Sequence, residues 1–129
     1  MRLHHVQLSM HRGEESQARS FYQEALGLVE VAKPKALAGR GGCWFRSNPE
    51  NAAVVEIHLG VEDGFVPSAK AHPAFVVDSR AELDNVAARI VNHGMEVNWD
   101  EEFTFDGFTR FHSKDPFGNR LEFLAPLHA

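Results

Sequence analysis

The sequence contains a single cysteine, Cys43, in 129 residues, so no intrachain disulfide can form. Proteins without disulfides are typical of reducing compartments, and we therefore expect a cytoplasmic protein. The chain also has no apolar run long enough to span a membrane, and residues 1–5 have no apolar core like that of a signal peptide. These absences predict a protein that has no membrane partner.

Positive charge is also scarce. Lysine and arginine total 13 against 18 acidic residues, a net charge of −5, and no basic cluster offsets it. Nucleic acid is therefore not an expected partner. The hydrophobic fraction of 43% and the charged fraction of 24% are those of an ordinary globular protein, and they argue against disorder. At this length we expect one domain, residues 1–129.

What the sequence does contain is an internal repeat. Equivalent residues recur 66 or 67 positions apart: His5 and His72 (72 − 5 = 67), Gly27 and Gly94 (94 − 27 = 67), and Glu56 and Glu122 (122 − 56 = 66). Both halves have the pattern strand, helix, strand, strand, strand. The repeat predicts an α+β fold of two βαβββ modules, at about residues 1–65 and 71–129.

The expected elements follow from apolar periodicity and turn residues. In the first module a helix starts near residue 14 and ends at Gly27, residues 34–42 form a loop and residues 47–49 a turn, and strands are predicted at 3–10, 28–32, 43–46 and 53–59. Residues 60–71 are a predicted linker. In the second module a helix starts at the capping box of Ser79 and Glu82 and ends at Gly94. Its strands are predicted at 72–77, 95–99, 108–113 and 120–124, the last after a turn containing Pro116 and Gly118.

Each module contributes one histidine near the start of its first strand and one glutamate in its last strand. These four residues are predicted to lie on the face opposite the apolar residues: His5, Glu56, His72 and Glu122. A carboxylate in the middle of a strand needs a partner, because burying it unpaired is costly. Two imidazoles and two carboxylates suit one divalent metal ion, such as Ni, Co, Zn, Mn or Fe.

Other interpretations of these residues remain open. A lone strand histidine is more often structural, and Glu56 by itself could be solvated. His58 lies two residues after Glu56, on the same face, and is an alternative ligand. His4 is predicted to point to the opposite face and is excluded. Without one carboxylate, the set becomes two histidines and one carboxylate, which suits Fe(II).

The chain resembles the vicinal oxygen chelate superfamily, which includes glyoxalase I, extradiol dioxygenases, fosfomycin-resistance transferases and bleomycin-resistance proteins. The resemblance rests on four stretches: His5-Val6-Gln7-Leu8, Ser20-Phe21-Tyr22 with Leu26-Gly27-Leu28, His72-Pro73-Ala74-Phe75, and Asp115-Pro116-Phe117-Gly118-Asn119-Arg120-Leu121-Glu122. It implies an open, barrel-like cup with a metal at its base, held by His5, His72 and Glu122 and, in glyoxalase I-like members, also by Glu56. Short members of this superfamily usually form homodimers in which both subunits contribute ligands.

The function expected from this resemblance is that of a divalent-metal-dependent enzyme of the glyoxalase type, with lyase or isomerase chemistry through an enediolate of a small oxygen-chelating substrate. Glu56 or Glu122 would act as general base and then general acid. Trp44, Arg46, Arg110 and His112 are the candidate substrate-binding residues. The alternatives are a non-catalytic drug-binding protein of the bleomycin-resistance type and an Fe(II) extradiol-type dioxygenase.

Overall fold

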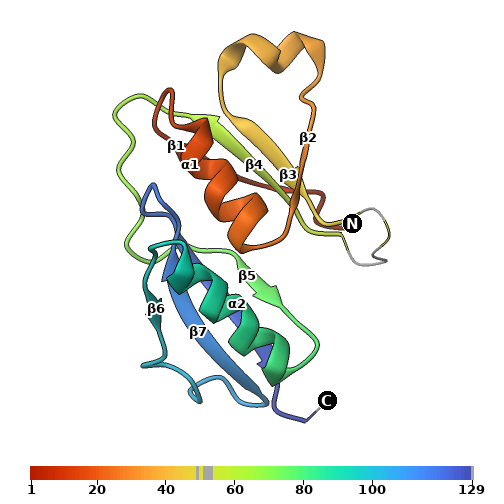
Figure 1. Cartoon of the computed structure of the whole chain (residues 1–129), viewed down its shortest axis with the longest axis vertical. Helices are drawn as coiled ribbons and strands as arrows, with labels where there is room; N and C mark the ends of the chain where they lie inside the picture. The colour runs from red at the N-terminus through yellow and green to blue at the C-terminus, as the bar shows by residue number, and fades with distance from the viewer. Residues whose placement is uncertain (49, 51–53, 129) are drawn as a thin grey trace. The chain divides into compact units, whose positions relative to one another are not determined.

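The computed structural model describes residues 1–48, 50 and 54–128. The chain divides into two compact units, Met1–Pro67 and Ser68–Ala129. Each unit contains one four-stranded mixed sheet together with its helices (Figure 1). None of the helices in the described part of the chain has the length and apolarity needed to cross a bilayer.

The first unit follows the predicted order of elements. Its strand order is β1-β4-β3-β2, with β1 parallel to β4 and the other pairs antiparallel. The elements along the chain are β1 (Val6–Met10), α1 (Glu15–Ala18), the π-helical η1 (Arg19–Ala25), β2 (Val29–Val31), the 3₁₀-helical η2 (Lys35–Arg40), β3 (Cys43–Arg46) and β4 (Glu56–Val61).

The second unit has the same topology. Its strand order is β5-β8-β7-β6, again with the first pair parallel and the others antiparallel. The elements are β5 (Ala74–Val76), α2 (Arg80–Asn92), β6 (Val97–Asn98), β7 (Phe108–Lys114) and β8 (Arg120–Pro126). The matching orders of the two sheets confirm the predicted α+β fold of repeated βαβββ modules.

Several predicted strand and loop boundaries were wrong. The first strand of each unit is shorter than predicted, so that His5 precedes β1 and His72 precedes β5. The predicted 34–42 loop contains η2, and the predicted linker begins with two residues of β4. The predicted start of the fourth strand at Ala53 and the turn residue Pro49 lie outside the described residues.

The remaining differences are small. The structure places β2 at Val29–Val31, β6 at Val97–Asn98, the end of β7 at Lys114 and the end of β8 at Pro126. Only β3 has the predicted bounds. Edge strands such as β2 and β6 pair on one side only, so their ends depend on a single partner strand and are hard to predict from periodicity.

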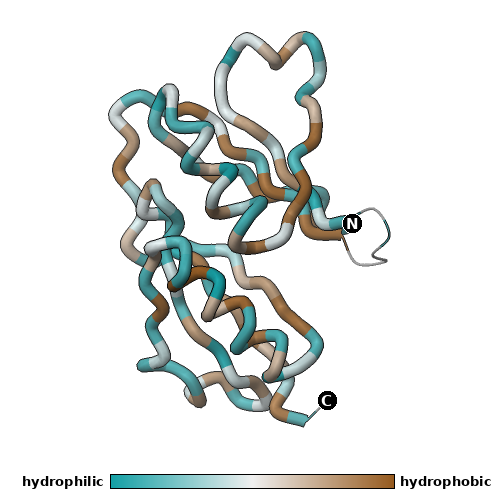
Figure 2. The backbone as a smooth tube through the Cα atoms, viewed as in Figure 1, coloured by the Kyte–Doolittle hydropathy of each residue, from teal (hydrophilic) through white to brown (hydrophobic). Residues whose placement is uncertain are grey.

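Helix α2 buries one face against its own sheet. Ser79 caps its N-terminus by accepting a hydrogen bond from the Glu82 backbone N–H at 3.1 Å, and Gly94 follows its end at φ = 84°. The buried side chains are Leu83, Val86, Ala87 and Ile90, whereas the neighbouring Val91 is exposed. Hydrophobic and hydrophilic residues alternate along the helix in Figure 2. The opposite face of β7 and β8 carries the polar side chains of His112 and Glu122 together with the apolar Leu124.

The turn between β7 and β8 is built around a buried carboxylate. Asp115 is 1% exposed, and its Oδ1 accepts hydrogen bonds from the backbone N–H groups of Phe117 and Asn119, both at 2.9 Å. Its Oδ2 accepts a further hydrogen bond from Asn119 Nδ2 at 2.8 Å. Gly118 adopts φ = 88°, a backbone conformation that would be strained for a residue with a side chain. These contacts fix how many residues separate the two strands.

We predict that Asp115→Ala lowers the free energy of unfolding by about 3 kcal/mol, because two buried backbone N–H groups and one side-chain amide lose a charged acceptor. The change is measured as a lower midpoint in urea unfolding. Asp63→Ala, which removes an exposed partner of Arg12, should unfold at the wild-type urea concentration. An equal shift in both variants would contradict the prediction.

Candidate functional site

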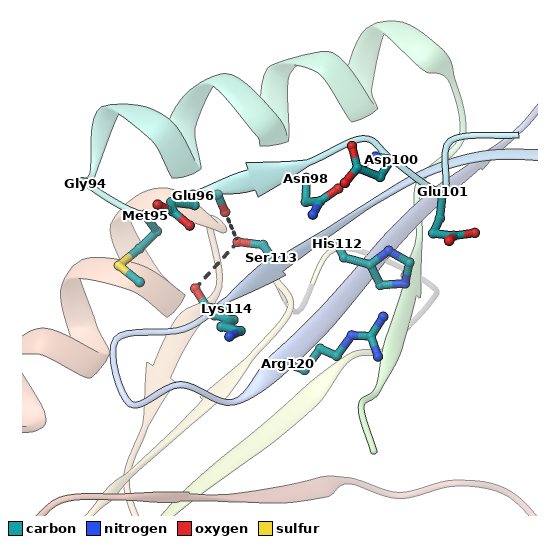
Figure 3. A pocket seen from close by; sticks show the side chains of 10 residues that line it. All are labelled: Gly94, Met95, Glu96, Asn98, Asp100, Glu101, His112, Ser113, Lys114 and Arg120. Carbon is teal, nitrogen blue, oxygen red and sulfur yellow. Dashed lines mark hydrogen bonds between the residues drawn. The ribbon is translucent and has the colours of Figure 1, made fainter. Parts of the chain in front are cut away.

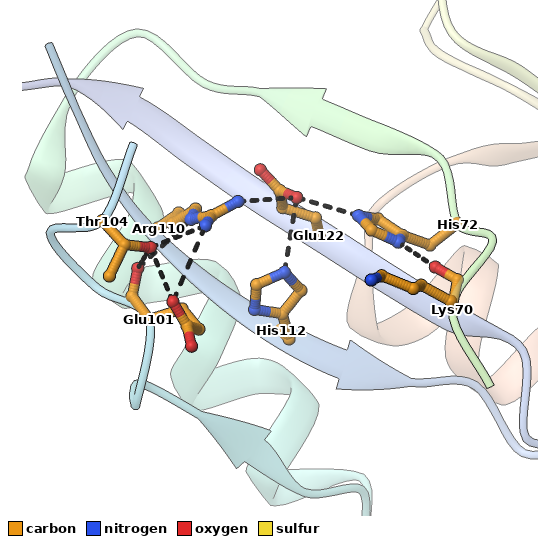
Figure 4. A network of polar contacts seen from close by, with 7 residues as sticks. All are labelled: Lys70, His72, Glu101, Thr104, Arg110, His112 and Glu122. Atoms are coloured by element: carbon orange, nitrogen blue, oxygen red, sulfur yellow. Dashed lines mark hydrogen bonds and ion pairs between the residues drawn. The ribbon is translucent and has the colours of Figure 1, made fainter. Parts of the chain in front are cut away.

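The second unit brings together two histidines and a glutamate on one surface of its sheet. Nitrogen and oxygen atoms of His72, His112 and Glu122 all lie within 4.8 Å of one another. His72 Nε2 is 2.9 Å and His112 Nε2 3.3 Å from the same oxygen, Glu122 Oε1. Figure 4 shows both rings directed at the carboxylate, with α2 behind the sheet. Glu122 and His112 are buried, whereas His72 is partly accessible.

His72 is oriented in a way that bears directly on metal binding. Its Nδ1 donates a hydrogen bond to the backbone carbonyl of Lys70 at 2.6 Å. In a neutral imidazole the other nitrogen, Nε2, then carries a lone pair, and that lone pair faces the Glu122 carboxylate. Two acceptors this close require a proton or a cation between them. The same Nδ1–H to carbonyl arrangement orients histidines that bind metals.

Arg110 supplies the fixed positive charge next to Glu122. One guanidinium nitrogen lies 3.2 Å from Glu122 Oε1, the other donates to Thr104 Oγ1 at 2.7 Å, and Nε donates to the Glu101 backbone carbonyl at 3.2 Å (Figure 4). The predicted substrate-binding residue Arg110 is therefore engaged by the loop before β7. The structure pairs Glu122 with this arginine, and the metal expected as its partner stays a prediction.

Two groups around Arg110 have shifted pKa values. Burial alone would raise the pKa of Glu122, but the hydrogen bonds from His72 and Arg110 outweigh it and hold the pKa below its ordinary value. Burial lowers the pKa of His112, and the nearby charge of Arg120 lowers it further. At neutral pH the carboxylate is therefore charged and His112 is neutral, which are the forms that bind metal ions.

The first unit holds a related but different group. Ligand atoms of His4, His5 and Glu56 lie within 4.8 Å of one another. His4 Nδ1 is 2.9 Å from His5 Nδ1 and 3.8 Å from Glu56 Oε2, and Arg46 Nε is 3.2 Å from Glu56 Oε1. The predicted orientation of His4 was wrong, because His4 and His5 both precede β1 and strand alternation does not apply to them.

His58 lies in a stack of rings. Its imidazole packs between the indole of Trp44, at 3.6 Å between ring centroids, and the imidazole of His5, at 4.0 Å. Its Nε2 is hydrogen-bonded to Glu56 Oε2 at 2.8 Å. The predicted substrate-binding residue Trp44 thus holds His58 in place. His58, the alternative ligand, contacts Glu56 rather than joining the group of His4 and His5.

The pKa values in the first unit shift in the same directions as those in the second. Burial would raise the pKa of Glu56, but the hydrogen bond from His58 and the charges of His4 and Arg46 lower it below its ordinary value. Burial lowers the pKa of His58, against the effect of its bond to Glu56. Glu56 is thus ionised beside a neutral His58 at neutral pH.

The strand register corrects one premise of the repeat. Gln7 pairs with His58, and Ala74, which lies 67 positions after Gln7 (74 − 7), pairs with Glu122. If His5 and His72 are equivalent, the position equivalent to Glu122 is therefore His58 and not Glu56. On that premise, the offset of 66 between Glu56 and Glu122 does not relate equivalent positions.

The structure thus pairs the predicted ligands within each unit: His5 is grouped with Glu56, and His72 with Glu122. Whether the two pairs meet in one site stays a prediction. Two members of these groups were missed as candidate ligands: His4 was excluded, and His112 was assigned only to substrate. Counting back across the turn from Glu122 would have placed His112 directly opposite it, since the two are register partners.

The chain matches the family model of the glyoxalase, bleomycin resistance protein and dioxygenase superfamily over residues 2–123. The chain belongs to this superfamily. Its histidine and glutamate groups could hold the divalent metal that members typically use. The search of curated proteins finds no significant match.

Solved structures agree with this membership. A protein from Bacillus anthracis assigned to the glyoxalase family is 40% identical, with 98% of this chain and 99% of that chain covered and a TM-score of 0.79. Two more distant structures share the fold. They are the fosfomycin resistance protein FosX from Listeria monocytogenes (17% identity, 98% and 91% covered, TM-score 0.74) and the antibiotic binding protein TnmS3 from Streptomyces sp. CB03234 (22% identity, 98% of both chains, TM-score 0.64).

We predict that Glu122→Gln is less stable than the metal-free wild type by about 2 kcal/mol at neutral pH, because the basic groups around it lose their charged partner. A carboxylate whose pKa is lowered in the folded state stabilises the protein at any pH above its ordinary pKa of 4.5. This stabilisation is lost as the pH falls through the folded-state pKa. The difference between the two proteins should therefore narrow below pH 4.5. Urea unfolding in chelator from neutral to acidic pH measures it.

Asp106→Asn is the control, since this carboxylate lies on an exposed loop. Its unfolding should differ little from wild type at any pH. A stability difference for Glu122→Gln that stays constant from neutral to acidic pH would show that Glu122 is not held ionised by its neighbours.

Proposed function

We propose that this protein is a divalent-metal-dependent enzyme of the glyoxalase type that acts on a small substrate chelating through oxygen, by lyase or isomerase chemistry. The observation that carries the proposal is the His72–Glu122 pair. His72 Nε2 lies 2.9 Å from Glu122 Oε1 while the other His72 nitrogen donates to a backbone carbonyl, so Nε2 is the nitrogen turned towards the carboxylate. A cation between the two atoms satisfies both of them.

The residues proposed to hold the metal are His5 and Glu56 from the first unit and His72 and Glu122 from the second. His58 remains the alternative to Glu56. Nitrogen and oxygen donors in this mixture suit Ni, Co, Zn, Mn or Fe. When bound, such an ion supplies Lewis-acid stabilisation of negative charge on a substrate oxygen.

Proton transfer is assigned to the two glutamates, which are the proposed catalytic residues. They differ in how firmly their charge is held. Glu122 faces the largely buried guanidinium of Arg110, whose side chain is 16% exposed, whereas Glu56 faces Arg46, whose side chain is 50% exposed. Solvent screens the second pair more, so Glu56 regains basicity more easily. We therefore favour Glu56 as the proton shuttle and Glu122 as the anchoring carboxylate.

The proposed substrate-binding residues have distinct tasks. Arg110 offers a fixed cation next to the carboxylate, where it can stabilise charge that develops on a substrate oxygen. His112 is neutral at neutral pH and can donate or accept a hydrogen bond there. Trp44 and Arg46 would act through their contacts with His58 and Glu56 in the first unit.

The Fe(II) extradiol-type dioxygenase is the second candidate, since each unit groups two histidines with one carboxylate. The third is drug binding without catalysis. Superfamily members bind small molecules and often form dimers. We propose a cytoplasmic homodimer in which both units together form one domain, with small-molecule ligands and neither nucleic acid nor membrane as a partner.

We predict that the protein takes up one divalent metal ion per site and that single substitutions His5→Ala, Glu56→Ala, His72→Ala and Glu122→Ala each reduce the metal content. Elemental analysis after reconstitution and gel filtration measures it. His11→Ala, outside both groups, should retain the full content. Full metal retention in all four ligand variants would rule out this ligand set.

The pattern of loss also separates the chemistries. Retention of iron by Glu56→Ala, together with its loss from the other three variants, would favour the dioxygenase. Absence of any stoichiometric metal from the wild type would favour drug binding.

We further predict that metal-loaded protein converts a hemithioacetal to a thioester, and that Glu56→Gln lowers kcat by at least about a hundredfold, the typical contribution of a general base. The absorbance of the thioester follows the reaction. No turnover with Ni, Co, Zn or Mn would contradict glyoxalase-type chemistry.

A further inference from the structure

A cavity in the second unit lies next to the candidate metal group of His72, His112 and Glu122. It is lined by two cationic side chains outside that group, Lys114 and Arg120. Its volume is about 650 Å³. His112, Ser113 and Lys114 of β7 and Arg120 of β8 form one side, and Asn98 and Asp100 lie on the side of β6 (Figure 3). His112 belongs to both the cavity and the candidate metal group.

Lys114 of β7 and Arg120 of β8 lie directly opposite each other on adjacent strands. They are register partners at the start of the β7–β8 ladder, just outside the turn. Like charges directly opposite on neighbouring strands destabilise a sheet. Among the described residues, neither side chain has a hydrogen-bond or ion-pair partner that would offset this repulsion. The pair therefore has a cost in the unliganded protein.

The acidic residues around the cavity do not neutralise the pair. The Glu101 carboxylate accepts a hydrogen bond from Thr104 Oγ1 at 2.7 Å and lies 4.0 Å from Arg110. Glu96 and Asp100 are exposed on the side of β6. Figure 3 shows the Glu101 carboxylate directed away from Arg120. Both cations thus remain available to a ligand in the cavity.

We propose that Lys114 and Arg120 bind an oxyanion group, a carboxylate or a phosphate, of the small molecule on which the protein acts. A guanidinium and an ammonium together match such a group, because arginine donates two parallel hydrogen bonds and lysine adds a point charge. An anion between them removes the like-charge repulsion. Neutral substrates gain nothing from the pair.

The strand geometry also sets the size of the ligand. His112 and Glu122 form the next row of the same ladder, two residues further along each strand and on the same face. Two residues of a strand span roughly 7 Å. The charged group therefore lies roughly that far from substrate oxygens at the candidate metal group. As a statement about substrate, this rests on the proposed function, whereas the anion site can be tested without metal.

The test is calorimetric titration of chelator-treated protein with inorganic phosphate and, separately, with malonate at the same ionic strength. We expect saturable binding of at least one anion, with the stronger of the two identifying the class. Arg120→Gln and Lys114→Gln should each weaken binding about tenfold, because each removes a charge-assisted contact. Lys35→Gln, an exposed cation of the first unit, should bind like wild type.

The double variant Lys114→Gln/Arg120→Gln should lose anion binding while its metal content stays that of wild type. Each single variant should also be at least as stable as wild type at low salt, since a repulsion is removed. Absence of binding by the wild type, or unchanged binding by the double variant, would overturn the proposal. The titration uses metal-free protein, so anion binding can be observed even if the protein binds no metal. Metal binding can likewise be observed even if no anion binds.

Discussion

The register of the β7–β8 hairpin is the constraint on which the second unit depends. Asp115 holds the connection at five residues by accepting two backbone hydrogen bonds, so that Lys114 must pair with Arg120 and His112 with Glu122. A shift of one residue would turn Glu122 towards α2, against the buried Leu83 and Ile90, where an unpaired carboxylate is costly. The buried Asp115 in the turn thus fixes the position of the buried Glu122 in β8.

Both glutamates depend on neighbouring basic groups to remain charged. Glu122 has His72, Arg110 and His112 around one oxygen, and Glu56 has His4, Arg46 and His58. In each case the opposing nitrogen donors outweigh desolvation and keep the pKa low. A metal ion in either place would take over part of this role, because a divalent cation stabilises the charged form of a carboxylate more strongly than a neutral imidazole does.

The sequence was a good guide to features that repeat and a poor guide to features that depend on pairing. Apolar periodicity and the glycine stops predicted the order of elements in both units, since burial on one face requires them. His4 was misjudged because the alternation rule was applied to residues that precede β1. The equivalence of Glu56 and Glu122 was misjudged because parallel register is set by sheet packing between strands some 50 residues apart, as Gln7 with His58 (58 − 7 = 51), and leaves no local signal. The β7–β8 register was different: its turn is local, and the pairing of His112 with Glu122 could have been counted.

The lost equivalence has a chemical consequence. If the two modules were copies in every detail, their carboxylates would sit in matching environments and share one role. Instead the position equivalent to Glu122 is held by His58, which is stacked between Trp44 and His5 and is neutral at neutral pH, while Glu56 lies two residues earlier, opposite the more exposed Arg46. The carboxylate of the second unit is therefore fixed by a largely buried guanidinium, whereas the carboxylate of the first unit faces an arginine that is half exposed to solvent. This difference is the basis for proposing Glu56 rather than Glu122 as the proton shuttle, because a general base must accept and release a proton during the reaction.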